Sequence, residues 1–141
     1  MELEIAKQKA IAYLVKSKKT SSEVTLKLKK LNFSDEIIEQ VVSYFTELGY
    51  INDNEYVDAY MRQCMRLQNY SLFEIKNKLL QKGIKKDIIE EKIQVLEDSN
   101  YEKELVEKLL NGKLKNMEEI KQKQYLFRRG FKNISLYSDE Y

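Results

Sequence analysis

Apolar residues recur at helical spacing along most of the chain. In residues 35–48, Ile37, Val41, Phe45 and Leu48 follow one another at steps of three or four, which places them on one face of a helix. This apolar stripe is wide enough to contact both its own unit and a neighbouring one, so we expect this helix to be an internal spine. Similar stripes predict helices over residues 4–18, 21–31, 35–48, 54–68, 72–82, 86–98, 102–115 and 118–129.

The helical pattern repeats along the sequence. A shift of 51 residues places Thr20 and Glu23 on Ser71 and Glu74, and a further shift of 47 residues gives a third, weaker copy. A hydroxyl residue followed three positions later by glutamate has the spacing of a capping box, which starts a helix. We therefore predict three repeats of three helices, over residues 4–50, 51–99 and 100–141.

Composition restricts the fold class. The chain of 141 residues contains no proline and only four glycines, which leaves few residues suited to tight turns and hairpins. We predict an all-α fold in which tandem three-helix repeats form a curved, elongated, solenoid-like array. Asn32, Gly83 and Gly130 occupy equivalent positions and should end their helices in the left-handed conformation. Only residues 131–141 follow Gly130, so we expect a truncated third repeat with at most a stub of its third helix.

The residue types present exclude several kinds of chemistry. The sequence has no histidine and a single cysteine, Cys64, so a Ser-His triad, an intrachain disulfide and most zinc sites are ruled out. We therefore expect no enzyme activity, no cofactor and no metal. The chain also lacks an 18-residue apolar run, and its first residues are acidic where a signal peptide would be basic. We expect a cytoplasmic protein without a membrane segment.

The net charge of +2 hides a regular alternation of charge along the chain. Residues 7–30, 59–86 and 108–132 carry net charges of +7, +6 and +6, whereas residues 31–58 and 87–107 carry −7 and −6. If the repeats stack in register, one side of the array becomes basic and the other acidic. A basic side of this kind could follow a phosphate backbone. The alternative is that the charge blocks are ordinary solvated helix faces.

Helix-face geometry selects candidate binding residues. Arg62 and Arg66 lie one turn apart on one helix, and a second basic face includes a tyrosine, which suits phosphate contact together with stacking. Helix packing is the alternative role for that tyrosine, Tyr125. We expect charge reversal at Arg128 and Arg129 to weaken binding and leave thermal stability nearly unchanged. The candidate contacts to a filament or to phosphate are Arg62, Arg66, Lys76, Lys82, Lys121, Tyr125, Arg128 and Arg129.

Several stretches resemble one bacterial family. They are Ala10-x-x-Tyr13-Leu14, then Leu48-Gly49-Tyr50-Ile51-Asn52-Asp53-x-x-Tyr56-Val57-x-x-Tyr60, then Ile75-x-x-x-Leu79-x-x-Lys82-Gly83-Ile84 and finally Leu126-x-x-Arg129-Gly130-Phe131. In these stretches the chain resembles the RecX family from about residue 6 to residue 131. The resemblance implies a regulator that binds the RecA filament on single-stranded DNA and restrains its ATPase, strand-exchange and coprotease activities. We expect it to be a monomer, although the sequence does not fix the oligomeric state. The resemblance also implies binding to DNA, including duplex DNA without sequence preference.

The sequence departs from the family pattern in places, and it leaves a competing hypothesis open. Asn32 replaces the glycine expected in the first repeat, Val57 replaces a small alanine, and the third repeat is short. The competitor is a helix-turn-helix DNA-binding protein without a RecA partner, because residues 20–45 contain two helices joined by a short turn. Against it, the helix after the turn is acidic, and phosphate would repel it.

Overall fold

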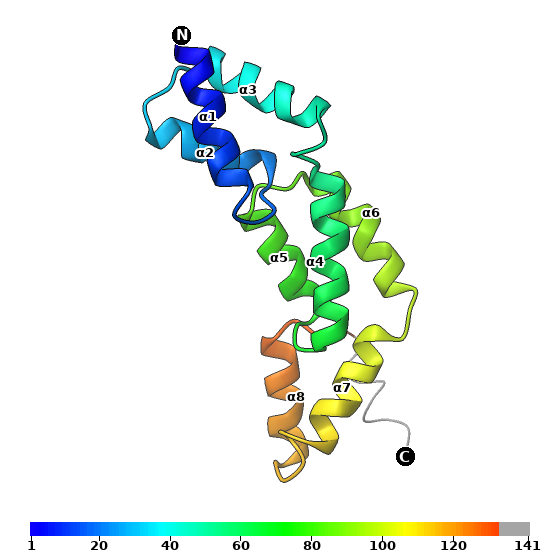
Figure 1. Cartoon of the computed structure of the whole chain (residues 1–141). Helices are drawn as coiled ribbons and strands as arrows, with labels where there is room; N and C mark the ends of the chain where they lie inside the picture. Colours follow the sequence, from blue (N-terminus) through cyan, green and yellow to red (C-terminus); the bar gives the residue numbers. More distant parts are fainter. Residues whose placement is uncertain (133–141) are drawn as a thin grey trace.

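The computed structural model describes residues 1–132, and all of its regular structure there is α-helical. Figure 1 shows an elongated, curved array in which α1–α3 lie at one end, α4–α6 in the middle and α7 and α8 at the other end. The prediction of an all-α fold with tandem three-helix units is therefore confirmed. The helices are α1 (Glu2–Leu14), α2 (Ser21–Lys30), α3 (Asp35–Glu47), α4 (Asp53–Leu67), α5 (Leu72–Gln81), α6 (Lys86–Glu97), α7 (Tyr101–Asn111) and α8 (Glu119–Arg128).

Both predicted capping boxes are present. The Thr20 hydroxyl accepts the Glu23 backbone N–H at 3.0 Å, and the Glu23 carboxylate accepts the Thr20 N–H at 2.9 Å. Ser71 and Glu74 make the same two bonds at 3.1 and 2.9 Å. Each box satisfies backbone donors that the first turn of a helix leaves without a partner. The starts of α2 and α5 are therefore fixed by local sequence.

The second helix of each unit ends in the same way. Asn32, Gly83 and Gly130 have φ angles of 69°, 82° and 84°, as the sequence predicts. After each of them, the next backbone N–H returns to a carbonyl five residues earlier, with N···O distances of 3.2, 3.2 and 3.1 Å. These bonds satisfy carbonyls at the helix end and turn the chain sharply.

Two first helices are shorter than the sequence predicts. The helix expected over residues 4–18 ends at Leu14, because the chain must become extended to place Thr20 in its cap position. The helix expected over residues 102–115 ends at Asn111. There Leu114 turns back to donate its backbone N–H to the Leu109 carbonyl at 2.8 Å, and its side chain is fully buried. The predicted stub of a third helix in the third repeat lies outside the described residues.

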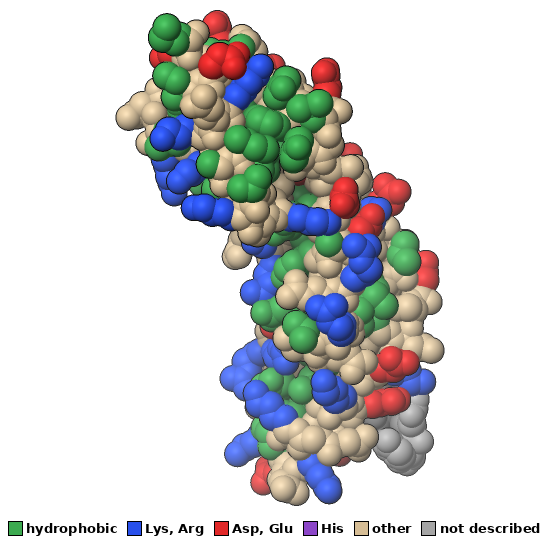
Figure 2. Space-filling model, in the orientation of Figure 1, with side chains coloured by type: hydrophobic (Ala, Val, Ile, Leu, Met, Phe, Trp, Pro, Cys, Tyr) green, Lys and Arg blue, Asp and Glu red, His purple; other side chains and the backbone are tan. Residues whose placement is uncertain are grey.

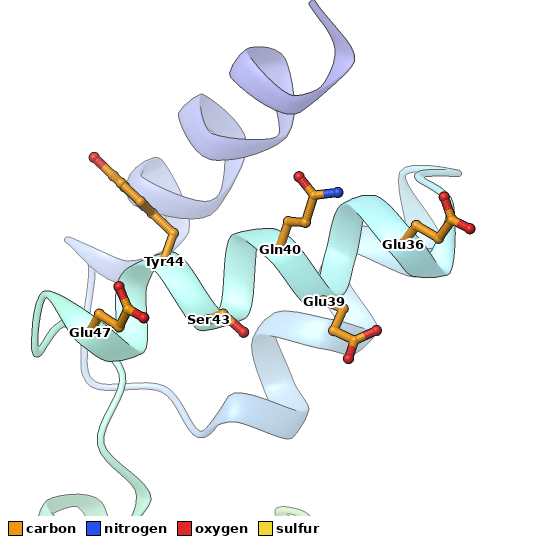
Figure 3. A pocket seen from close by; sticks show the side chains of 6 residues that line it. All are labelled: Glu36, Glu39, Gln40, Ser43, Tyr44 and Glu47. Carbon is orange, nitrogen blue, oxygen red and sulfur yellow. The ribbon is translucent and has the colours of Figure 1, made fainter.

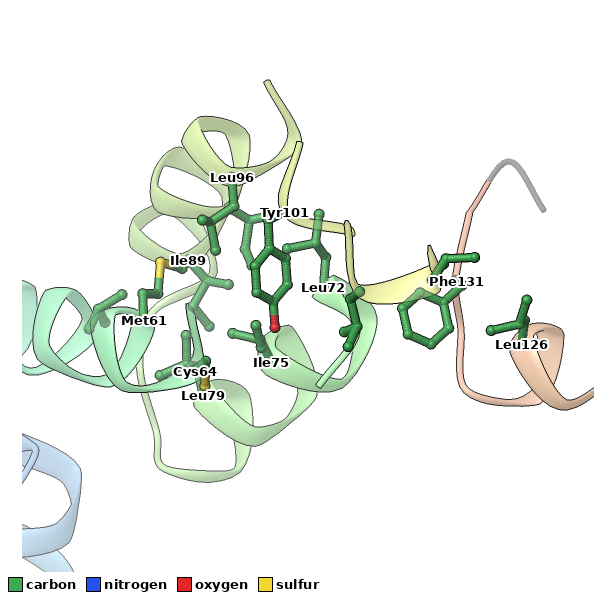
Figure 4. Close-up of a cluster of buried hydrophobic side chains, with 14 of the residues drawn as sticks. Met61, Cys64, Leu72, Ile75, Leu79, Ile89, Leu96, Tyr101, Leu126 and Phe131 are labelled. Atoms are coloured by element: carbon green, nitrogen blue, oxygen red, sulfur yellow. The ribbon is translucent and has the colours of Figure 1, made fainter. Parts of the chain in front are cut away.

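Among residues 1–132, the buried hydrophobic side chains form two clusters. One contains nine residues of α1, α2, α3 and the following turn, and ends at Ile51. The other begins at Val57 and extends through α4, α5, α6 and α7 to α8, as Figure 4 shows in part. The expected spine role of α3 is wrong: it packs against α1 and α2 of its own unit, and Leu48 is 56% exposed.

The capping residues also join successive units. While accepting from Glu23, the Thr20 hydroxyl donates to the Lys82 carbonyl at 2.8 Å. In the same way, the Ser71 hydroxyl donates to the Arg129 carbonyl at 2.6 Å. The start of each second helix therefore contacts the end of the next second helix, and this lines up α2, α5 and α8 along one edge (Figure 1).

Candidate functional site

The charge blocks of the sequence are separated in space. Figure 2 shows most Lys and Arg side chains over α4 and along the edge where α2, α5 and α8 lie, and many Asp and Glu side chains along the opposite edge, where α6 and α7 lie. This separation follows from the repeat, because equivalent helices of similar charge stack in register. A long surface of one sign raises the local concentration of an oppositely charged partner.

The sequence-predicted cations fall into two groups. Arg62, Arg66, Lys121 and Arg128 are exposed, and within residues 1–132 no carboxylate lies within 4.0 Å of their charged atoms. These side chains are free to contact a ligand. Lys27 and Lys30 on α2 are also exposed without such a partner, and Lys78 on α5 is half-buried without one; sequence reasoning selected none of these three. We call these seven residues the basic ribbon: Lys27, Lys30, Arg62, Arg66, Lys78, Lys121 and Arg128.

The remaining predicted cations already have acidic partners. Lys76 lies 3.9 Å from Glu90, and Lys82 lies 4.0 Å from Glu23. A hydrogen bond with Tyr56, which outweighs the opposing effect of burial, raises the pKa of Lys82, and Glu23 adds to this. These lysines bridge helices, so a ligand would have to compete with an existing pair for them.

Arg129 is the most constrained of the predicted residues. Its guanidinium donates from Nε to Glu74 at 3.2 Å and from a terminal nitrogen at 2.7 Å, and it also donates to the Asn69 carbonyl and, at 3.2 Å, to the Tyr125 hydroxyl. Only 20% of the side chain is exposed. Charge reversal at Arg129, which joins α8 to α5, should therefore cost stability, while an unchanged stability stays the prediction for Arg128.

The Glu74–Arg129 pair gives a pH prediction. Burial favours the neutral form of Glu74, but hydrogen bonds from Arg129 and Ser71 outweigh it and lower the pKa of the carboxyl. A lowered pKa stabilises the fold above the unfolded value, about 4.3, and this contribution is lost as pH falls through the folded value. We expect Glu74→Gln, which keeps the capping box, to lower the free energy of unfolding by about 2 kcal/mol at pH 7.

The comparison variant is Glu23→Gln at the equivalent position, where the lysine partner is 4.0 Å away. It should cost less than about 1 kcal/mol. Urea unfolding at pH 7 and pH 3.5 measures both changes. The difference between wild type and Glu74→Gln should shrink at the lower pH, and equal differences at the two values would refute the assignment.

In each unit a lysine ammonium lies over a tyrosine ring beside the second helix. Lys27, Lys78 and Tyr125 occupy the same position on their second helices. The ammonium of Lys27 lies 5.5 Å from the centre of the Tyr13 ring, that of Lys78 lies 4.6 Å from Tyr70, and that of Lys113 lies 5.0 Å from Tyr125. Residues 27, 78 and 125 are separated by 51 and 47 positions, the two repeat lengths of the sequence. This repeat could have identified the pairs, whereas the pattern within one helix could not.

Tyr125 has the packing role that the sequence offered, and its hydroxyl faces two cations. Its ring packs against the core, and its hydroxyl accepts from Lys113 at 3.1 Å and from Arg129 at 3.2 Å. Burial alone would raise the pKa of the phenol, but these two hydrogen bonds together lower it. The hydroxyl therefore holds the ammonium of Lys113 beside the guanidinium of Arg129, which is itself paired with Glu74.

The acidic side of the first unit has a different character. A shallow pocket of about 560 Å³ lies on α3, and Figure 3 shows the three carboxylates of Glu36, Glu39 and Glu47 along it, with Tyr44 between. Phosphate would be repelled from this helix, which is the one that a helix-turn-helix protein would insert into DNA. The geometry therefore disfavours the competing hypothesis.

Other chemistry finds little support in the described part of the chain. No group of three or more Cys, Asp or Glu side chains in residues 1–132 is arranged to hold a metal ion. Cys64 is 2% exposed, and burial raises the pKa of its thiol, which makes it unreactive. No helix of residues 1–132 is long and apolar enough to cross a membrane.

Comparison with known proteins points to one family. The family described as RecX, first three-helix domain, matches residues 6–45, and that described as RecX, second three-helix domain, matches residues 52–93. The chain is 32% identical over 132 residues to the regulatory protein RecX of Caldanaerobacter subterraneus subsp. tengcongensis, which covers 93% of this chain and 66% of that protein. It is 34% identical over 119 residues to that of Clostridium tetani, covering 82% and 54%.

A solved structure extends the similarity to the whole array. The crystal structure of RecX from Lactobacillus salivarius superposes with a TM-score of 0.78 at 28% identity, and the match covers 98% of this chain and 95% of that one. The chain spans 66% and 54% of the length of the two curated relatives. The solved structure and both family matches share the tandem arrangement of three-helix units.

Proposed function

Because the chain belongs to the RecX family, we propose that it regulates RecA by binding the RecA filament on single-stranded DNA. In this proposal it restrains the ATPase, strand-exchange and coprotease activities of the filament. The observation that carries the proposal is the basic ribbon, seven cations over α2, α4, α5 and α8 that have no carboxylate partner within residues 1–132. A ribbon of this length fits an extended anionic partner better than a compact one.

The two-signed surface supports a partner made of both protein and nucleic acid. Unpaired Lys and Arg side chains favour phosphate, and Arg adds a planar fork that can contact two oxygens at once. The acidic edge along α6 and α7 would be repelled by DNA, so in the complex it faces protein or solvent. Both sides of the array can contribute if it lies along a nucleoprotein filament.

The binding residues within this proposal are those that the structure leaves free. Arg62, Arg66, Lys121 and Arg128 make direct contacts. Lys82 and Arg129 join successive units beneath them, and Lys76 joins α5 to α6 within the second unit. Tyr125 serves the surface by holding Lys113 in place. The protein acts as a cytoplasmic monomer with repeats over residues 4–50, 51–99 and 100–141, and DNA binding has no sequence preference.

The decisive experiment measures ATP hydrolysis by RecA on single-stranded DNA while this protein is titrated in. DNA is kept in excess, so simple competition for DNA cannot lower the rate. We expect inhibition at substoichiometric ratios of this protein to RecA, because one bound array disturbs many filament subunits. An unchanged rate with a folded protein and its cognate RecA would contradict the proposal and favour plain DNA binding.

A further inference from the structure

The two contacts between successive units share one plan. We call them joint 1, between the first and second units, and joint 2, between the second and the third. In each joint a hydroxyl donates to the carbonyl before a left-handed glycine, Gly83 or Gly130. In each, an acid of the next first helix accepts a backbone N–H at the start of the second helix: Asp53 from Ser21 at 2.8 Å, and Glu102 from Leu72 at 3.0 Å.

Joint 2 adds apolar packing to this plan. Leu72 and Tyr101 are 5% exposed, and both belong to the same buried cluster as Phe131 in the third unit. Figure 4 shows Leu72 between Tyr101 and Phe131. The Tyr101 hydroxyl donates to the Tyr70 carbonyl at 2.5 Å, and burial raises its pKa to about 12, so it stays a donor. The second and third units therefore share one hydrophobic core.

Joint 1 has a polar residue at one of these positions and an exposed tyrosine at another. Ser21 stands where joint 2 has Leu72, and Tyr50 stands where joint 2 has Tyr101. Tyr50 is 56% exposed instead of 5%. Across this joint the described residues form hydrogen bonds and ion pairs, while their buried hydrophobic side chains stay in two separate clusters.

The ion pairs are also longer or more exposed in joint 1 than the main pair of joint 2. Joint 2 is closed by the two-bonded pair between Arg129 and Glu74, whose shortest distance is 2.7 Å. The equivalent pair in joint 1 joins Lys82 and Glu23 at 4.0 Å, and the further pair of Lys18 with Glu55 is more than half exposed. Exposed pairs hold geometry weakly, whereas a shared apolar core fixes it.

We propose that joint 1 is a hinge and that joint 2 is fixed, so that the described chain consists of two bodies, residues 2–51 and residues 53–132. Bending at joint 1 changes the angle between the part of the basic ribbon on α2 and the part on α4, α5 and α8. If the proposed function holds, this lets one chain follow filaments of different pitch. The hinge itself does not depend on that function, because it arises from contacts within the chain.

The test measures distances in the free protein. In a Cys64→Ala background, spin labels are placed by cysteine substitution at the exposed residues Gln40 and Gln63 across joint 1, or at Gln63 and Gln124 across joint 2. Electron double resonance then gives the distribution of distances for each pair. We expect a distribution across joint 1 at least twice as wide as that across joint 2. Equal widths would overturn the proposal.

A second pair of variants separates the hinge from label flexibility. Ser21→Leu gives joint 1 the leucine that joint 2 has at this position and should narrow the distance distribution across joint 1. Arg129→Lys gives joint 2 the lysine that joint 1 has at this position and should widen the distance distribution across joint 2. Circular dichroism confirms that each variant stays folded. Unchanged widths in both variants would contradict the assigned cause. A hinge observed in a chain that does not inhibit RecA would refute the proposed function and leave this inference standing.

Discussion

Replacing Gly130 by alanine should lower the free energy of unfolding by about 3 kcal/mol, because two separate costs add. The residue has a φ of 84°, where an L side chain is strained. A Cβ there would also lie 2.5 Å from Cδ2 and 2.6 Å from Cβ of Phe73. Rotation cannot move the Cβ of Phe73 away, so α5 and α8 must separate. Urea unfolding of the purified variant measures the change.

Gly49→Ala is the matched control. Gly49 has the same φ of 84°, but nothing lies within 4 Å of the position that a Cβ would take. It should therefore show only the conformational cost, about 1 kcal/mol. The difference between the two variants isolates the close contact between units. Equal costs at Gly49 and Gly130 would contradict the packing of α8 against the start of α5.

The second large effect concerns binding. Reversing three charges of the basic ribbon, with Lys27→Glu, Lys78→Glu and Arg128→Glu, should weaken binding to single-stranded DNA or to its RecA filament by more than about tenfold at 0.1 M salt. Each lost phosphate contact should also reduce the slope of log K against log salt by about 1. Stability should change little, because none of the three side chains has a carboxylate partner within residues 1–132.

The control variant carries the same change in net charge on the acidic edge. It combines Lys86→Glu, Lys103→Glu and Lys108→Glu, which lie on α6 and α7. Titrations at several salt concentrations, with fluorescence anisotropy as the readout, compare the two triple variants. If both lose affinity equally, only overall charge matters, and the basic ribbon is not the binding surface.

Local sequence determined most of the fold. The apolar spacing gave every described helix to within a few residues at each end, and the hydroxyl–glutamate boxes at Thr20 and Ser71 gave two helix starts. The equivalence of Asn32 with Gly83 and Gly130 predicted three left-handed residues. These features depend on interactions within five residues, so the chain encodes them without reference to the rest of the molecule.

The order of charge along the chain also predicted where the basic side would lie. Helices of like charge recur at the repeat length, so stacking the repeats in register brings them to one edge (Figure 2). Sequence could not show which cations stay free. Arg128 and Arg129 are neighbours in the chain, yet one points to solvent and the other binds Glu74, 55 residues away.

Tertiary structure alone decided how the units are joined. Tyr50 and Tyr101 occupy equivalent positions and have the same side chain, but the first is 56% exposed and the second 5% exposed. The difference arises from the residues that meet them from another unit, which lie tens of positions away in the sequence. Local pattern therefore determines which helices form and which face of each is apolar. Contacts between distant segments decide which joints share a core and which cations remain available to a partner.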